Sequence, residues 1–158
     1  ERTYQLIKNN LPKFNAPVIL TGEQEKVDIF VASNLAIAKS GTNTLELSIY
    51  KLPMIIAYRI NLLSYLLVKF MVKVKFANLI NLILNKEVIP EMIQQNCIAS
   101  KLATKLEELM NNQELQEYQK KESQIALKIL GMGSKEKPSD RAAKAINILL
   151  KNLWKVSA

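Results

Sequence analysis

A turn of three small residues, Ser40-Gly41-Thr42, has the composition of an anion-binding site. It follows the apolar run 35–38, which is typical of a buried strand, and a helical pattern opens directly after it. The free N–H groups of a helix start and the positive end of its dipole attract an anion. Gly41 lets a ligand approach the backbone, and the flanking hydroxyl groups can donate hydrogen bonds. The turn therefore predicts contact with an anionic ligand.

Glu46 lies one turn into the same predicted helix, where its carboxylate can accept hydrogen bonds from the hydroxyl groups of a ribose. A second interpretation needs no ligand. In a capping box, Asn43 is the N-cap and Glu46 reaches back to its N–H group. The spacing alone leaves both interpretations open.

The composition argues against several kinds of chemistry. The 158 residues include no histidine and one cysteine, Cys97. A Ser-His triad, a metal site and an internal disulfide are therefore not expected within the chain, and the lone cysteine suggests a reducing compartment. Hydrophobic residues make up 49% of the chain, which is enough for a folded core.

The net charge of +8 is concentrated in the most apolar part of the chain. Residues 53–86 hold basic residues and no acidic one. A basic, apolar surface suits anionic lipid better than nucleic acid, so we predict a membrane surface as a partner, bound through Lys69, Lys73 and Lys75, and no nucleic acid. Alternatively, 60–75 is a core helix whose lysine heads reach water. Its longest uncharged run, 60–68, is too short to span a bilayer.

Apolar runs of strand length alternate with helical patterns in the first part of the chain. The runs cover 16–20, 35–38 and 54–57, and the helical patterns cover 3–10, 23–33 and 42–50. This alternation predicts an α/β fold, with a Rossmann-like parallel sheet covered by helices on both faces. Ligands of such sheets bind beyond the carboxyl ends of the strands, where the turn at 40–42 and Arg59 would lie.

The chain after residue 100 is helical in pattern, with a link at 131–138 before a last helix capped by Ser139-Asp140. We therefore predict two parts. A Rossmann-like lobe covers 1–130, and a linker with a carboxyl-terminal helix covers 131–158.

Several motifs recur together in the order and spacing of one known family. They are AKSGT at 38–42, TLE at 44–46, PMIIAYR at 53–59, VKVKF at 72–76, NL at 81–82, EVIPE at 87–91 and SDRAA at 139–143. In this pattern the chain resembles the carboxyl-terminal part of lipid-A-disaccharide synthase, a GT-B glycosyltransferase. The likeness is densest over 28–94. Ile80 stands where that family usually has proline, and Asn85-Lys86 where it has glycine and a basic residue.

The resemblance implies the activity of a UDP-sugar-dependent transferase. That family joins UDP-2,3-diacylglucosamine to 2,3-diacylglucosamine 1-phosphate, releases UDP, and needs no cofactor. Its donor lobe would bind the UDP-sugar through Ser40, Gly41, Thr42, Glu46 and Glu91. The residues facing the cleft between lobes, predicted as catalytic, are Arg59 and Asn81.

The resemblance also implies a place in the cell, the bacterial cytoplasm at the inner face of the inner membrane. We expect the amino-terminal lobe, with the acceptor site and the catalytic base, to lie outside this sequence, so that the chain alone is inactive. Whether the protein forms oligomers is left open. Two alternatives remain: another GT-B enzyme using UDP-N-acetylglucosamine (a peptidoglycan lipid glycosyltransferase or an epimerase), and a non-catalytic membrane-surface module.

Overall fold

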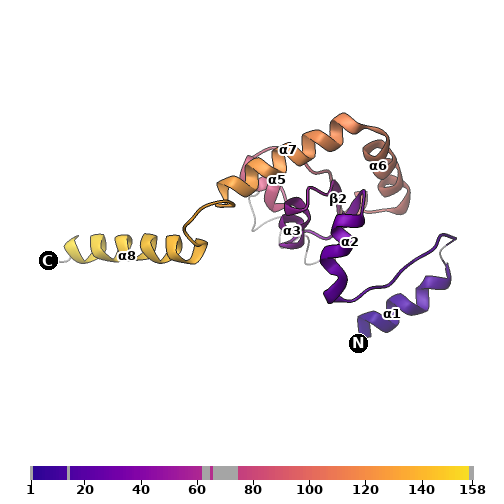
Figure 1. Ribbon diagram of the computed structural model, residues 1–158, viewed down its shortest axis with the longest axis horizontal. Coiled ribbons are helices and arrows are strands. Elements are labelled where there is room, and N and C mark those ends of the chain that lie inside the picture. The colour runs from indigo at the N-terminus through magenta and orange to yellow at the C-terminus, as the bar shows by residue number, and fades with distance from the viewer. Residues whose placement is uncertain (1, 14, 62–64, 66–74, 157–158) are drawn as a thin grey trace. The chain divides into compact units, whose positions relative to one another are not determined.

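The computed structural model describes residues 2–13, 15–61, 65 and 75–156 (Figure 1). Its internal contacts divide the chain into two compact units, Glu1–Ser33 and Asn34–Ala158. The division at residue 131 that the composition suggests is a different one and stays a prediction.

The first unit is helical. It contains α1 (Arg2–Asn10), the 3₁₀ turns η1 (Leu11–Lys13) and η2 (Glu23–Glu25), and α2 (Lys26–Ala32). The helices predicted here are confirmed, but the strand predicted over 16–20 is wrong, because the described residues of that stretch have no regular structure and Ile19 is 85% exposed. A strand needs a neighbour to pair its N–H and C=O groups, and the described part of this unit contains none.

The second unit is built on a parallel sheet, as the alternation of patterns predicts. Three strands form it, and they lie side by side in sequence order. The strands are β1 (Ala36–Ala38), β2 (Met54–Tyr58) and β3 (Glu91–Ile93). The register sets Ala38 opposite Ile56, and Ile56 opposite Glu91. Helix α3 (Asn43–Ile49) lies in the connection from β1 to β2, and helix α5 (Leu79–Leu84) lies in the connection from β2 to β3. Right-handed crossovers in one direction place both helices on the same face of the sheet.

Three longer helices complete the second unit: α6 (Ala99–Asn111), α7 (Gln113–Ile129) and α8 (Pro138–Val156). An apolar cluster joins α6 to the sheet, with Ile55, Met92 and Leu109 buried at its centre. Helix α7 packs against α3, α5 and α6, and Figure 1 shows it running beside the two crossover helices. Helices therefore surround the sheet, which is consistent with the predicted α/β class. Across the described ranges, every helix is too short or too polar to traverse a lipid bilayer.

Candidate functional site

The turn Ser40-Gly41-Thr42 lies just beyond the carboxyl end of β1, where the sequence predicts it. Gly41 has φ +144°, a backbone conformation that residues with a side chain rarely adopt, and a Cβ atom built there would meet no atom of the described residues within 4 Å. The backbone of the turn is therefore open to a ligand. The Ser40 hydroxyl donates to the carbonyl oxygen of Ala77 at 2.6 Å, so its proton is used to hold the turn against the chain before α5.

Helix α3 begins at Asn43, with Thr42 as its N-cap and no side-chain hydrogen bond at the cap. The alternative with Asn43 as the N-cap of a capping box is therefore wrong, because Asn43 is already the first helical residue. The hydroxyl of the buried Thr44 donates to the carbonyl oxygen of Gly41 at 2.7 Å, and this hydrogen bond stabilises the turn. Glu46 lies in the first turn of the helix and is half-buried.

Glu91, the first residue of β3, fixes the approach to α5. Its two carboxylate oxygens accept hydrogen bonds from the backbone N–H groups of Ala77 (2.8 Å) and Asn78 (2.9 Å). Asn78 then caps α5, since its side-chain oxygen accepts from the N–H groups of Ile80 (2.8 Å) and Asn81 (3.3 Å). The Glu91 carboxylate thus holds backbone, and its role as a direct UDP-sugar contact stays a prediction.

The side chain of Asn81 is fully buried, and every hydrogen-bonding group of its carboxamide is engaged. Its oxygen accepts from the N–H groups of Val88 (2.9 Å) and Ile89 (3.0 Å). Its nitrogen donates to the carbonyl oxygen of Ile89 (2.8 Å) and to the carboxylate of Glu91 (2.9 Å). In this arrangement Asn81 shapes the 88–91 segment and presents no atom to a ligand. The catalytic role inferred from its motif stays a prediction.

These contacts form one polar network across three segments. It runs from Ser40 through Ala77 to Glu91 and Asn81, and so ties the turn after β1 to the start of β3. The sequence indicates most of these residues one by one through their motifs. It does not indicate that they bond to one another.

Cations gather beside this network. The ammonium group of Lys39 lies 5.5 Å from the ring centroid of Tyr58, the last residue of β2, and Arg59 follows with its side chain exposed. Positive charge at the carboxyl ends of the strands favours the binding of an anionic ligand. Lys75 is also exposed, whereas Lys69 and Lys73 lie outside the described residues.

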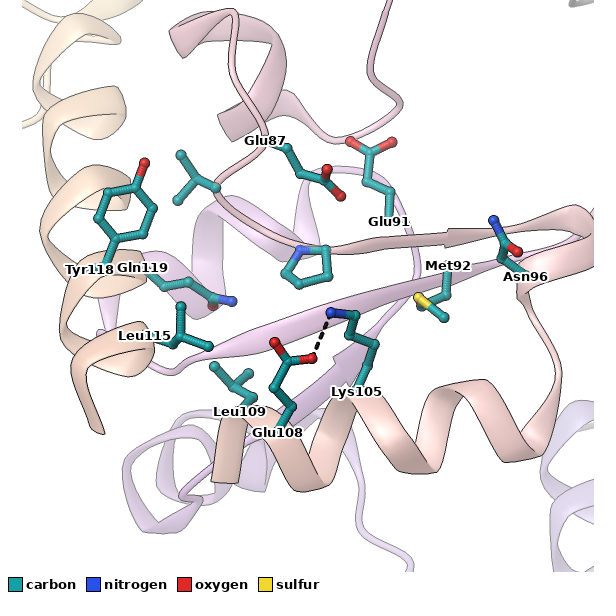
Figure 2. A pocket seen from close by; sticks show the side chains of 12 residues that line it. Glu87, Glu91, Met92, Asn96, Lys105, Glu108, Leu109, Leu115, Tyr118 and Gln119 are labelled. Carbon is teal, nitrogen blue, oxygen red and sulfur yellow. Dashed lines mark hydrogen bonds and ion pairs between the residues drawn. The ribbon is translucent and has the colours of Figure 1, made fainter. Parts of the chain in front are cut away.

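A pocket of about 500 Å³ that the sequence does not indicate lies beside β3, between α6 and α7 (Figure 2). Its lining includes Lys105 and Glu108, which form an ion pair at 2.6 Å, and Tyr118. Glu91 lies at its rim, with the carboxylate directed away from that ion pair. The lining shares Glu91 with the polar network but contains neither the turn at 40–42 nor Arg59. Within the described ranges, no three acidic, cysteine or histidine side chains gather in a way that could hold a metal ion.

Comparison with known proteins points to one family. A family model described as lipid-A-disaccharide synthetase matches residues 2–146. The lipid-A-disaccharide synthases of Rickettsia typhi and Rickettsia prowazekii are each 43% identical to this chain over 122 residues, which is 77% of the chain and 32% of the relative. That of Rickettsia conorii is 44% identical over 110 residues, covering 70% of the chain and 25% of the relative. The chain thus spans about a third or less of the length of these curated relatives.

Proposed function

Because the chain belongs to the lipid-A-disaccharide synthetase family, we propose that it forms the UDP-sugar-binding part of a glycosyltransferase of lipid A biosynthesis. The observation that carries this proposal is the open turn at 40–42, which follows a parallel strand and occurs within the matched region. Ligands of open parallel sheets bind at this edge.

The proposed reaction transfers 2,3-diacylglucosamine from its UDP carrier to 2,3-diacylglucosamine 1-phosphate. The bond between the sugar and the diphosphate breaks, a glycosidic bond to the oxygen of the acceptor hydroxyl forms, a general base takes the proton of that hydroxyl, and UDP leaves with the electron pair of the broken bond. The backbone N–H groups at 41 and 42 would bind the diphosphate, and Glu46 would accept from the ribose hydroxyls. Arg59 would stabilise the charge that develops on the leaving group. Asn81 and Glu91 would act through the backbone that they hold.

We also propose a peripheral position on the inner face of the bacterial inner membrane. The acyl chains of both substrates must leave a bilayer, and the basic, apolar stretch 60–75 lies in the chain between Arg59 and Asn81. Of its three lysines, Lys75 is the described one, and it is exposed. Binding should be stronger to vesicles with anionic lipid than to neutral ones, and salt should reduce it without abolishing it. Equal cosedimentation with both vesicle types would remove the membrane surface from the proposal.

The test of nucleotide binding is calorimetric titration of the chain with UDP, comparing the parent with Glu46→Gln. Glutamine preserves the shape of the side chain but removes its charge. A hydrogen bond to a charged acceptor contributes roughly 1.5–3 kcal/mol, so the affinity should fall about 10- to 150-fold. Glu107→Gln, on the exposed side of α6, is the matched control and should leave the affinity unchanged. A parent chain without UDP binding would refute the proposed function and favour a non-catalytic module.

A further inference from the structure

Gln94 has an unusual backbone conformation for its place in the fold. Three residues other than glycine in the described part of the chain have φ near +50°: Lys51, Asn85 and Gln94. Asn85 is the C-cap of α5, and Lys51 follows the C-cap of α3. Left-handed residues are common at helix ends, which accounts for both. Gln94 instead follows strand β3 and opens the 3₁₀ turn η3 (Gln94–Asn96), so helix termination does not explain it.

The Gln94 side chain gives a reason for the conformation. It is buried, and both polar groups of its carboxamide bond to a single residue 34 positions earlier. Its oxygen accepts from the N–H of Ile60 at 2.8 Å, and its nitrogen donates to the carbonyl oxygen of Ile60 at 3.2 Å. Glycine or asparagine would adopt this backbone conformation more easily. Glycine has no side chain, and asparagine is one methylene too short to make the same two bonds.

These two bonds extend the pairing of β2 beyond the end of β3. The last paired residues of the two strands are Tyr58 and Ile93. A carboxamide has the same donor and acceptor as a peptide group, so the Gln94 side chain takes the place of a backbone partner where β3 turns away. Arg59 therefore lies between two residues with fixed backbone: Tyr58 is paired in the sheet, and Ile60 is hydrogen-bonded to the side chain of Gln94. Its backbone is fixed on both sides while its side chain is exposed at the carboxyl edge.

We propose that Gln94 is a positioning residue of the nucleotide-sugar site, which sets the path of the chain leaving β2 and thereby directs Arg59 toward the diphosphate. This inference rests on the proposed function for the identity of the ligand. It assigns to Gln94 no contact with the ligand, because both of its polar groups are used on Ile60.

The experiment is a double-mutant cycle, with UDP affinity measured by calorimetry on the 158-residue chain. Gln94→Asn suits the left-handed backbone but loses the bonds to Ile60, and it should weaken UDP binding about tenfold. Gln95→Asn, at the exposed neighbouring position, is the matched control and should bind UDP like the parent. If Gln94 acts through Arg59, the change Gln94→Asn should cost little further affinity in an Arg59→Met background. A purely structural role would instead lower the affinity by the same factor in both backgrounds.

The remaining outcomes of these UDP titrations separate the inference from the proposed function. If the parent binds UDP and Gln94→Asn binds it equally well, the inference is overturned and the proposed function stands. The same holds if the losses of UDP affinity caused by Gln94→Asn and Arg59→Met multiply in the double variant. A parent that does not bind UDP would overturn both.

A second variant covers the case in which Gln94→Asn does not fold. The protonated carboxyl of Gln94→Glu has the donor and acceptor of the carboxamide, whereas the ionised form has no donor for the Ile60 carbonyl. Its UDP affinity relative to the parent should therefore recover as the pH is lowered from about 8 to about 5, since burial raises a carboxyl pKa above its ordinary value. A relative affinity that does not change with pH would overturn the inference.

Discussion

The two ends of the parallel sheet are held by the same kind of contact but have different surroundings. At the carboxyl end, the side chains of Ser40 and Gln94 bond to backbone across segments, Ser40 to the carbonyl oxygen of Ala77 and Gln94 to Ile60. At the amino end, Gln119 of α7 accepts from the N–H of Met54 at 3.0 Å, and Gln124 donates to the carbonyl oxygen of Ser48 at 2.7 Å. The amino end is covered by α7, whereas the carboxyl end leaves an open turn and cations exposed. Anchoring at one end should therefore serve stability, and at the other it should also serve binding.

The largest effect is expected for Asn81→Ala. The substitution leaves the N–H groups of Val88 and Ile89 and the carbonyl of Ile89 without their partner. Each buried unpaired group costs about 1–3 kcal/mol, so we expect the free energy of unfolding in urea to fall by about 3–5 kcal/mol. The exposed Asn111→Ala serves as the control. A loss below about 1 kcal/mol would contradict the structural role and return Asn81 to the list of candidates for direct contact.

Gln119→Leu tests the amino end. The N–H of Met54 loses its acceptor in a buried position, which should lower the free energy of unfolding by about 1–3 kcal/mol. UDP affinity, measured well below the melting temperature, should equal that of the parent, because the open turn is at the other end of the sheet. Weakened UDP binding in a fully folded variant would show that the two ends are coupled and would break the comparison.

Gly41→Ala tests the open turn. A side chain at φ +144° is strained by about 1–3 kcal/mol, so the turn should change shape and UDP affinity should fall by about tenfold or more. The matched control is Gly22→Ala, since Gly22 also has open space around it but an ordinary φ of −91°. If UDP bound equally well to both variants, the turn would not be its site.

The smallest effect is expected for the ion pair between Lys86 and Glu122 of α7, at 2.9 Å. The hydrogen bond to Glu122 raises the pKa of Lys86 above its ordinary value of 10.5. A raised pKa means that the pair's contribution is fully present below the unfolded pKa and is lost as the pH rises through the folded one. The parent should therefore be slightly more stable than Lys86→Met at neutral pH in urea unfolding, and this advantage should disappear at strongly alkaline pH. An advantage that persists there would assign the effect to packing of the lysine stem.

The sequence by itself determines the fold class and the position of the open turn. Strands β1 and β2 are continuous apolar runs, and the turn at 40–42 is a local arrangement of small residues between a strand and a helix. Such features depend on neighbours in the chain, so pattern and motif suffice to predict them. The same motifs place the chain in its family.

Only the tertiary structure decided which segments pair and which side chains hold them. The run at 16–20 has the pattern of a strand but no partner to pair with among the described residues of its unit. In contrast, β3 is three residues long, begins with a glutamate, and forms because β2 offers it an edge. Nothing in the sequence distinguishes Gln94 from Gln95. Gln94 differs from Gln95 in its two hydrogen bonds to Ile60, 34 residues away, whose geometry exists only after the register of β2 and β3 is set. Hydrogen bonds between distant segments depend on that register, which no local pattern specifies.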